Sequence, residues 1–433
     1  MKNNISRVQY IYELYLQHPS VSLDSRQNVS GTIFFALKGD HHDGNAFARD
    51  ALAKGAAYAV IDDAQYYQEG GRYLLVADTL QVLQELAKIH RANLHIPIIG
   101  VTGSNGKTTT KELIHAVLSQ RYNCYATQGN LNNHIGVPIN ILSIQPSTEI
   151  AVLEMGANHV GEIAQLCELA KPTHGLITNI GNAHLAGFGD IEGVKRGKGE
   201  LYAYLKKHKG VVFINSTDPT LMQMSKEFST PIYYPQDQDF YPAKLIEAKP
   251  YVIYESDQGE VVTTHLIGKH YFYNISAALC IAKYFGVESH SANVAIQAYI
   301  PSNNRSQLVK KGSNIILLDA YNANPTSMQA ALEAFHFLTA SQKVVILGDM
   351  NELGEASISF HKRIVQLTTQ QNYKEILLYG PYMKEVCSYN PQALYFKQIE
   401  ELKDYIKNRK FTHTAILIKG SHSHRLERLV EYI

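Results

Sequence analysis

The chain has 433 residues, of which 45% are hydrophobic and 18% charged, and its formal net charge at pH 7 is +1. A charge so close to zero gives no basic field of the kind that binds nucleic acid or an acidic membrane surface. No apolar run approaches the roughly 18 residues that a membrane-spanning helix needs, so we expect no membrane span. The length is typical of about three domains of roughly 150 residues each.

The cysteines and the N-terminal segment both favour a cytoplasmic protein. The four cysteines are far apart and form no C-x-x-C pair, which is typical of reduced thiols: Cys124, Cys167, Cys280 and Cys387. Residues 1–16 are polar and rich in tyrosine, without the apolar core of a signal peptide. We therefore expect a cytoplasmic location.

Alternating strand and helix patterns predict an α/β protein with a mainly parallel sheet. We expect a smaller α/β N-terminal domain, a central domain and a Rossmann-like C-terminal domain, spanning residues 1–80, 81–300 and 301–433. In the first domain, strands are predicted at 32–37 and 57–61, with a short helix at 45–54 between them. The leucine spacing at 80–92 predicts a further helix, and this segment leads into the central domain.

The most informative segment opens the central domain. An apolar run at 97–101 ends in the turn Gly103-Ser104-Asn105-Gly106, and Lys107-Thr108-Thr109 then begins a helix with one apolar face. In such a turn the backbone N–H groups and the helix N-terminus face a phosphate, the lysine reaches the outer phosphates, and a threonine hydroxyl can ligate Mg²⁺. Val101 stands where the strict phosphate-loop pattern has its first glycine, so the core is the shorter Gly-x-x-Gly-Lys-Thr. A plain structural turn is the alternative, but strand, loop, lysine and helix together predict ATP binding by a P-loop-type ATPase domain.

The rest of the chain continues the alternation. Further strands of the central domain are predicted at 150–153, 175–178 and 211–215, with a helix at 161–169. The C-terminal domain alternates most regularly, with strands predicted at 315–319, 344–347, 376–379 and 415–418. Its first helix has Asn324 to cap it and Pro325 in the first turn, and apolar residues then repeat at helical spacing to Leu338. Ligands should gather at the carboxyl ends of the strands and in clefts between domains.

Three polar residues fall where predicted strands end. Glu154 closes the run 150–153 and could share Mg²⁺ with Thr108, although a salt bridge explains a single strand-end glutamate equally well. His184 follows another apolar run, where a hydrogen-bonded structural histidine is the ordinary interpretation. Asp319 could hold a ribose hydroxyl or could cap a helix.

Other polar residues carry weaker signals. The spacing around Lys198 favours a solvated helix lysine, and His422 with His424 favours a surface loop over a metal site. The residues alone therefore indicate a Mg-ATP enzyme with several α/β domains and leave its substrate open.

Taken together, the motifs resemble those of the ATP-dependent Mur ligases of peptidoglycan synthesis, and the resemblance extends from the first domain to the last residues. The phosphate loop 102–110 is shared by the whole superfamily. More selective motifs stand at 153–163, 319–328, 347–354 and 419–421, and those at 24–26 and 130–138 match the family's nucleotide-sugar side. The Asn-Pro-Arg-type motif of diaminopimelate-adding and lysine-adding relatives is absent, and folylpolyglutamate synthase lacks the run 321–325. One departure is Leu318, where the family often has a second aspartate before Asp319.

The resemblance implies a role for each matching residue. The ATP phosphates would be held by Gly103, Ser104, Asn105, Gly106, Lys107, Thr108 and Thr109. Lys107 would neutralise the outer phosphates, and the adenosine and phosphate side would include Asn274, Arg305 and Asp319. Metal ligands would be Thr108 and Glu154 for a first Mg²⁺, His184 for a second, and Lys198 as a carbamate, since an ammonium cannot bind Mg²⁺. Ser25 and Arg26 would hold the uridine diphosphate, and the muramoyl-peptide channel would be lined by Thr127, Asn130 and Asn133.

The resemblance also implies the reaction, in which ATP drives the joining of D-alanyl-D-alanine to UDP-N-acetylmuramoyl-tripeptide through an acyl phosphate. Lys107, Glu154, His184 and Lys198 would be the catalytic set, and the third domain would close over the central one. Two rivals are an amide ligase of the superfamily that uses another amine and a nucleotide-binding scaffold without catalysis. We expect a monomer, while the third peptide residue (diaminopimelate or lysine) and the occupancy of the carbamate stay open.

Overall fold

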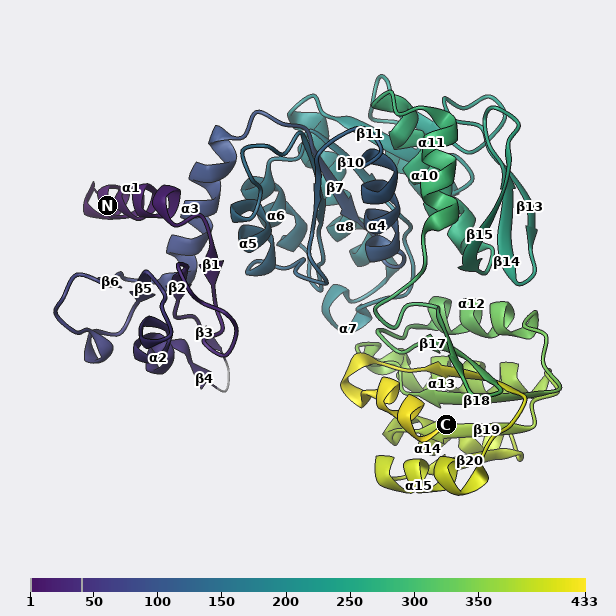
Figure 1. Ribbon diagram of the computed structural model, residues 1–433. Coiled ribbons are helices and arrows are strands. Elements are labelled where there is room, and N and C mark those ends of the chain that lie inside the picture. The colour runs from purple at the N-terminus through teal and green to yellow at the C-terminus, as the bar shows by residue number, and fades with distance from the viewer. Residues whose placement is uncertain (1, 40–41) are drawn as a thin grey trace.

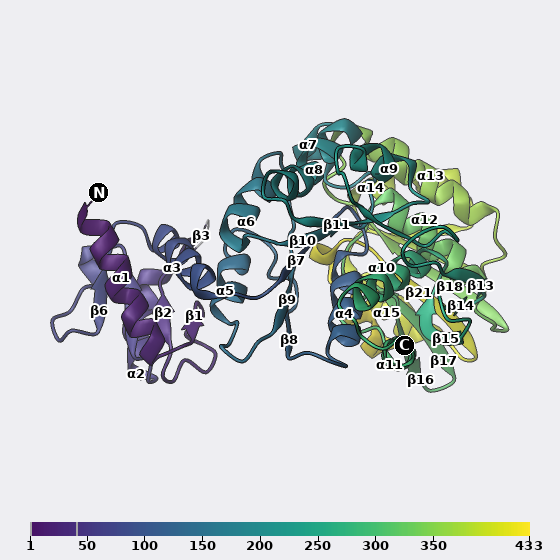
Figure 2. The ribbon, with the colours of Figure 1, turned by 90° about the horizontal axis from the view of Figure 1, so that it is seen from above.

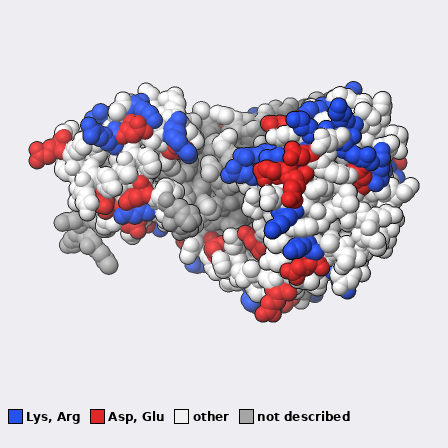
Figure 3. Space-filling model, turned by 90° about the horizontal axis from the view of Figure 1, so that it is seen from below, with Lys and Arg blue, Asp and Glu red and all other residues white. Residues whose placement is uncertain are grey.

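The computed structural model describes residues 2–39 and 42–433, and it consists of three α/β lobes in chain order. Figure 1 shows the N-terminal lobe (purple) beside the central lobe (blue to green), with the C-terminal lobe (green to yellow) against the other end of the central one. Seen from above in Figure 2, the N-terminal lobe again stands apart from the C-terminal lobe. Basic and acidic side chains are interspersed on the face drawn in Figure 3, in line with the small net charge. No helix among the described residues is long and apolar enough to cross a membrane.

The N-terminal lobe is built on a four-stranded parallel sheet. Its order is β1(Val21–Ser22), β2(Ile33–Phe35), β5(Tyr58–Ile61) and β6(Tyr73–Leu75). A separate antiparallel pair consists of β3(Lys38–Gly39) and β4(His42–Asp43). The helices are α1(Lys2–Gln17), α2(Ala48–Ala53) and α3(Thr79–Asn93). The predicted strands at 32–37 and 57–61 and the helix at 80–92 are confirmed. The segment predicted as a helix at 45–54 is a 3₁₀ turn followed by α2.

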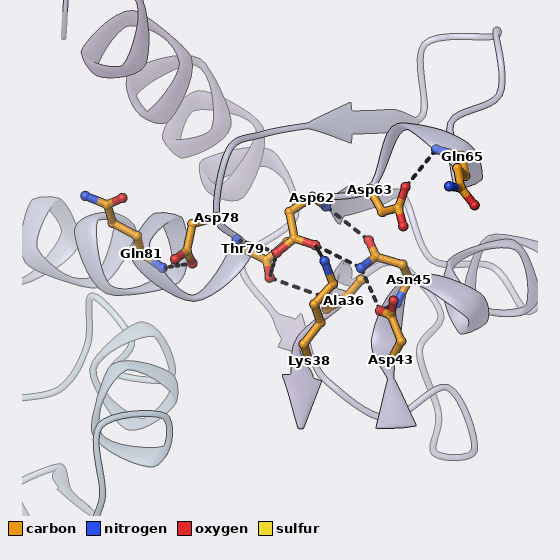
Figure 4. A network of polar contacts seen from close by, with 10 residues as sticks. All are labelled: Ala36, Lys38, Asp43, Asn45, Asp62, Asp63, Gln65, Asp78, Thr79 and Gln81. Carbon is orange, nitrogen blue, oxygen red and sulfur yellow. Dashed lines mark hydrogen bonds and ion pairs between the residues drawn. The ribbon is translucent and has the colours of Figure 1, made fainter. Parts of the chain in front are cut away.

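A polar network at the carboxyl end of β5 fixes the start of α3 (Figure 4). The Asp62 carboxylate accepts hydrogen bonds from Asn45 Nδ2 at 2.9 Å and Thr79 Oγ1 at 3.2 Å, and it pairs with Lys38 Nζ at 3.0 Å. Asp78 caps the helix by accepting from the Gln81 N–H at 2.8 Å. Because Asn45 and Thr79 are almost fully buried, these bonds satisfy polar groups that would otherwise be costly to bury.

Helix α3 also joins the N-terminal lobe to the central one. Its apolar face, which includes Leu83 and Leu86, belongs to one hydrophobic core with Tyr15 of α1 and with Val137 and Ile141 of the central lobe. The Tyr15 hydroxyl donates to the backbone carbonyl of residue 142. A continuous apolar core of this kind holds two lobes more firmly than a polar interface would.

The central lobe carries a six-stranded parallel sheet in the order β12(Ile232–Tyr234), β11(Val211–Asn215), β10(His174–Ile177), β7(Ile98–Thr102), β9(Ile150–Glu154) and β8(Cys124–Ala126). Its helices are α4(Lys107–Leu118), α5(Gly136–Leu142), α6(Glu162–Ala170), α7(Leu185–Phe188), α8(Ile191–Lys207), α9(Pro219–Ser225), α10(His270–Tyr284) and α11(Ser289–Ala298). Side chains of β7 alternate between two cores, with Ile98 on one face and Ile99 and Val101 on the other. The prediction of a parallel sheet covered on both sides is confirmed.

An antiparallel sheet was not predicted but follows the parallel one. It consists of β13(Lys244–Ala248), β14(Tyr251–Glu255) and β15(Val261–Ile267), and β15 packs against α11. The strand signal was weak because these strands are half-exposed and lack the continuous apolar run of a buried parallel strand.

The C-terminal lobe has a six-stranded sheet in the order β16(Gln307–Lys311), β17(Asn314–Asp319), β21(Thr414–Lys419), β18(Gln342–Gly348), β19(Glu375–Tyr379) and β20(Ala393–Phe396), in which only β16 is antiparallel. Its helices are α12(Pro325–His336), α13(Ser357–Thr369), α14(Pro381–Val386) and α15(Ile399–Arg409). The 3₁₀ segments of the chain are Gly44–Phe47, Ala64–Tyr66, Gly354–Ala356, Cys387–Tyr389, His422–His424 and Leu426–Tyr432. Asn324 caps α12 as predicted, accepting from the Ser327 N–H at 2.9 Å. All four predicted strands are confirmed.

Candidate active site

A cavity of about 420 Å³ lies between the central and C-terminal lobes, at the carboxyl ends of their strands. The central lobe contributes the loop 104–109, the end of β9 and the start of α10, and the C-terminal lobe contributes the end of β17, helix α12 and the end of β21. Of the predicted residues the cavity brings together Ser104, Asn105, Gly106, Lys107, Thr108, Thr109, Asn133, Glu154, His184, Asn274, Arg305 and Asp319. The cavity therefore unites residues more than 200 positions apart in the sequence.

Two glycines give the phosphate loop its shape. Gly103 has φ +140°, and a Cβ there would lie 2.0 Å from Thr178 Oγ1. Gly106 has φ +80°, and its Cβ would lie 2.9 Å from Asn274 Nδ2. Both the left-handed backbone and the lack of space require glycine. The Thr178 hydroxyl donates to the Asn105 carbonyl at 2.6 Å, which fixes the loop to the strand beside it.

The lysine of the loop is half-buried and folded onto the loop backbone. Lys107 Nζ donates to the carbonyl of Gly103 at 2.7 Å and of Ser104 at 3.3 Å. Burial lowers the pKa of Lys107, the Glu154 carboxylate opposes this shift, and the Arg305 charge adds to it. An anion in the cavity would stabilise both cations, and the N-terminus of α4 favours an anion at the same point.

Glu154 is buried at the end of β9, and one of its oxygens is left free. Its Oε1 accepts from Asn132 Nδ2 at 2.7 Å, and its backbone N–H donates to Thr127 Oγ1 at 2.9 Å. Its Oε2 is buried and has no hydrogen-bond partner among the described residues. The salt-bridge alternative for Glu154 is thus wrong, because its partner is an amide. A free carboxylate oxygen in a cavity that Thr108 also lines is the donor chemistry that Mg²⁺ prefers.

Asn132 is one cavity residue that the sequence did not single out. It lines the cavity and lies within the motif 130–138, but only its neighbours Asn130 and Asn133 were selected. Nothing in the spacing distinguishes three nearly adjacent asparagines. Only the path of the chain after β8 decides which amide faces Glu154.

His184 lines the cavity from the start of α7 and meets the C-terminal lobe there. Its backbone is left-handed, with φ 55°, and its Nδ1 forms an ion pair with the Glu352 carboxylate. The Ala186 N–H donates to the Glu352 carbonyl at 3.0 Å. The two lobes also touch at the phosphate loop, where Asn324 Nδ2 donates to Asn105 Oδ1 at 2.6 Å.

Lys198 is buried directly behind the cavity wall. Its side chain is 1% exposed, and Nζ donates at 2.8 Å to the carbonyl of Ala157, a residue that lines the cavity. Burial lowers the pKa of Lys198 well below its ordinary value, and the charge of Lys107 lowers it further. The alternative of a solvated helix lysine is wrong, because the side chain is enclosed and lies over the Phe188 ring at 5.0 Å.

The C-terminal lobe adds charged groups and an apolar wall to the cavity. Asp319 Oδ2 pairs with Lys419 Nζ at 2.6 Å, and Asp319 Oδ1 accepts from the Ser306 N–H at 3.1 Å. The Arg305 guanidinium stacks on the Tyr321 ring at 3.7 Å, while its Nε is buried without a hydrogen-bond partner in the part of the chain that the structure describes. The lobe's apolar residues Leu317, Ala331 and Ala334 line the cavity together with Ile267 at the end of β15. This combination suits a flat apolar ring with a charged tail.

The predicted substrate-side residues are dispersed. Asn133 lines the cavity, Asn130 is exposed beside Tyr321, and Thr127 is buried behind Glu154. Ser25 and Arg26 lie in the N-terminal lobe, outside the cavity.

The exposed Arg26 side chain pairs with Asp24 through two hydrogen bonds of 2.8 Å. These bonds hold the pKa of Asp24 at about 2. Lys54 Nζ donates to the carbonyl of the buried Ser25 at 2.9 Å.

The cavity has fewer protein side chains that could bind a metal ion than a site built from protein ligands alone would need. Within residues 2–39 and 42–433 no group of three or more His, Cys, Asp or Glu side chains could hold a metal ion. Glu154, His184 and the Thr108 hydroxyl are the unmodified donors of the predicted set, so further ligands would have to come from phosphate oxygens, water or a modified lysine. His422 is exposed, as predicted, and His424 packs against Tyr379.

Comparison with known proteins gives matches along the whole chain. Three family models match, described as "Mur ligase family, catalytic domain" over residues 19–91, "Mur ligase middle domain" over 101–282 and "Mur ligase, glutamate ligase domain" over 304–422. The UDP-N-acetylmuramoyl-tripeptide–D-alanyl-D-alanine ligase of Bacillus subtilis is 34% identical, with 97% of this chain and 94% of the relative covered. The Escherichia coli enzyme of the same name is 31% identical, with 95% and 92% covered.

Solved structures agree with these sequence matches. A crystal structure of MurF from Acinetobacter baumannii superimposes with a TM-score of 0.83 at 28% identity, covering 95% of this chain and 92% of that one. MurF from Thermotoga maritima in complex with ADP gives a TM-score of 0.82 at 26% identity, covering 96% and 97%. The chain is thus similar to these relatives in sequence and in the arrangement of its three lobes.

Proposed function

Because the chain belongs to the Mur ligase family, we propose that it is the ATP-dependent ligase that joins D-alanyl-D-alanine to UDP-N-acetylmuramoyl-tripeptide. The product is UDP-N-acetylmuramoyl-pentapeptide, a precursor in peptidoglycan synthesis. The observation that carries this assignment is the match over nearly the full length of relatives that all bear this one activity in their names. The cavity, with a phosphate loop on one lobe and charged residues on the other, supports the use of ATP.

The chain's own residues account for nucleotide binding. Backbone N–H groups of the loop 103–109 and the Lys107 ammonium hold the phosphates, and Arg305 approaches the same anion from the C-terminal lobe. Asp319 and Asn274 lie on the nucleoside side, next to the apolar wall that receives the adenine ring. Burial lowers the pKa of Lys107, and a bound phosphate would oppose that shift because an anion favours the charged ammonium.

Mg²⁺ fits the first metal site because Glu154 Oε2 has no hydrogen-bond partner among the described residues, and because Glu154 and Thr108 line the same cavity. When bound there, the ion neutralises charge on the transferring phosphoryl oxygens. His184, which also lines the cavity, would be a protein ligand at a second site.

Lys198 fits a carbamate, because burial lowers the pKa of its amine and so favours the neutral form, which can attack CO₂ to form the carbamate and release a proton. The modified side chain offers oxygen donors where an ammonium offers none.

The reaction is amide formation in two steps. The terminal carboxylate of the tripeptide attacks the γ-phosphate to give an acyl phosphate and ADP, and the amine of D-alanyl-D-alanine then attacks the acyl carbon and releases phosphate. An acyl phosphate hydrolyses readily, so water must be excluded. The contacts between the lobes, Asn105 with Asn324 and His184 with Glu352, enclose the cavity at two points. We expect them to break when the lobes open for substrate exchange.

Each domain has its own role in this proposal. Residues 1–80 form the domain that binds the UDP-sugar through Ser25 and Arg26, 81–300 the ATP-binding domain, and 301–433 the C-terminal domain. When the substrate binds, Arg26 would leave its ion pair with the Asp24 carboxylate and pair with the diphosphate instead. Thr127 supports Glu154 from behind, while Asn130 and Asn133 line the path of the muramoyl peptide. The enzyme acts as a cytoplasmic monomer.

Phosphate release from ATP tests the proposal, with UDP-muramoyl-tripeptide and D-alanyl-D-alanine supplied singly and together. Release that requires both, with the pentapeptide product identified by mass, is the expected result. Release with the tripeptide and a different amine would retain the ligase chemistry and change the substrate. Tight ATP binding without turnover on any amine would favour the scaffold.

A further inference from the structure

The segment 299–306 connects α11 to β16 and so joins the central lobe to the C-terminal lobe. At its start it is attached to α4, the helix that begins at the phosphate loop. The Tyr299 hydroxyl donates to Glu112 Oε2 at 2.5 Å, and Asn303 Nδ2 donates to Glu112 Oε1 at 3.4 Å. One carboxylate on α4 thus accepts two hydrogen bonds from the connection between the lobes.

The other end of the segment is attached to β17 and the residues after it. The Ser306 N–H donates to Asp319 Oδ1 at 3.1 Å, and the Tyr321 N–H donates to the Asn304 carbonyl at 3.3 Å. Between these attachments Asn303, Asn304 and Ser306 have left-handed backbones, with φ of 58°, 57° and 45°. Asparagine adopts such a backbone more readily than other non-glycine residues, whereas at Ser306 it persists only where the surroundings impose it.

This constrained segment presents Arg305 to the nucleotide cavity. Arg305 lies between the left-handed residues, lines the cavity and stacks on the Tyr321 ring at 3.7 Å. Its position therefore depends on both attachments, because no helix or strand holds residue 305 directly.

The charges around Glu112 support the same conclusion. Arg305 shares this region with Lys107 and with Lys111, whose side chain is 4% exposed and whose Nζ donates to the Thr127 carbonyl at 2.8 Å. Burial lowers the pKa of Lys111, the Glu112 carboxylate 3.8 Å away opposes that shift most strongly, and Arg305 adds to it. Glu112 thus offsets the concentration of positive charge while it holds the segment in place.

We infer that Glu112 is a positioning residue that sets Arg305 in the nucleotide cavity by anchoring segment 299–306 to the phosphate-loop helix. The inference rests on the proposed role of Arg305 in nucleotide binding. Glu112 does not line the cavity and acts only through the segment. Without the anchor, the segment has to become ordered when the nucleotide binds, and the entropy lost in that step weakens binding.

The mildest test is Tyr299→Phe, which removes one hydroxyl and leaves the carboxylate beside Lys111. We expect the affinity for ADP, measured by calorimetry on the full-length protein, to fall about tenfold. The KM for ATP should rise by a similar factor, with little change in the KM for D-alanyl-D-alanine. The matched control is Tyr122→Phe, which removes a 2.6 Å hydroxyl bond to the Phe285 carbonyl just beyond α4 and outside the cavity. It should leave ADP affinity unchanged.

Combining Tyr299→Phe with Arg305→Ala separates this role from a general structural one. If Glu112 acts through Arg305, Tyr299→Phe has no further effect on ADP affinity once Arg305 is alanine. Independent, multiplying effects would overturn the inference and leave the nucleotide role of Arg305 intact. Full ADP affinity in Arg305→Ala alone would overturn the inference together with that role. Equal losses in Tyr299→Phe and Tyr122→Phe would also contradict it.

Discussion

Asn132 gives the sharpest prediction about the metal side of the active site. Its amide donates to Glu154 Oε1 at 2.7 Å and so fixes the carboxylate whose Oε2 has no hydrogen-bond partner among the described residues. Asn132→Ala removes that donor and leaves the carboxylate buried with only its backbone fixed by Thr127. Gly156→Ala disturbs the same bond by another route, because its Cβ would lie 2.7 Å from Asn132 Oδ1.

The size of the effect follows from the type of bond. A hydrogen bond to a charged group contributes about 1.5–3 kcal/mol, which is roughly 10- to 150-fold in an equilibrium constant. Removal of a group that orients a metal ligand typically weakens metal binding or activity by about 10–100-fold. We therefore expect the Mg²⁺ concentration for half-maximal activity to rise about 10- to 100-fold in Asn132→Ala, and kcat at saturating ATP to fall.

The assay is phosphate release as a function of Mg²⁺ concentration, with thermal unfolding measured on the same preparations. Asn123→Ala is the control, since it loses an amide bond of 2.9 Å to the Ser147 carbonyl on an exposed loop. Its Mg²⁺ dependence should match that of the unaltered enzyme. An unchanged Mg²⁺ dependence in both Asn132→Ala and Gly156→Ala would refute the role assigned to the Asn132 amide.

Three further predictions concern other parts of the molecule. Gly103→Ala should abolish ATP binding, measured by calorimetry, because its Cβ would lie 2.0 Å from Thr178 Oγ1 at a backbone φ of +140°. Lys198→Ala should lose most activity and regain part of it with added short carboxylates, and full activity without them would contradict the carbamate. Burial lowers the pKa of His174 to about 4. In the unfolded chain His174 has the ordinary histidine pKa of about 6.5, so the unfolded chain takes up the proton before the folded chain does as the pH falls. The contribution of His174 to stability is therefore complete above about pH 6.5 and is lost as the pH falls toward about 4. Urea unfolding of His174→Phe, with the ring still packed on Phe213, should show a smaller loss over that range.

Local patterns determined most of the secondary structure and the nucleotide loop. The glycine turn before Lys107 is specified by neighbouring residues, because φ values and backbone N–H directions depend on residues that are adjacent in sequence. The cap at Asn324 is equally local and was predicted correctly. The strands of β13 to β15 were missed because a half-exposed antiparallel sheet lacks the apolar run of a buried parallel strand.

The family resemblance selected several of the residues that line the cavity, but it left their partners open. Lys198 illustrates the difference, since its spacing favours a solvated lysine, whereas the packing of α8 encloses it behind Ala157. Burial on a helix depends on what covers the helix, and that covering comes from distant parts of the chain.

The sequence by itself determined that this protein binds ATP and, by resemblance, which reaction it drives. Only the tertiary structure decided that Asn132 orients Glu154, that Glu352 meets His184, and that Glu112 holds the connection to Arg305. The reason is physical. A phosphate loop is specified by neighbouring residues, whereas these contacts join side chains from different elements, and no periodicity in the sequence records which elements meet.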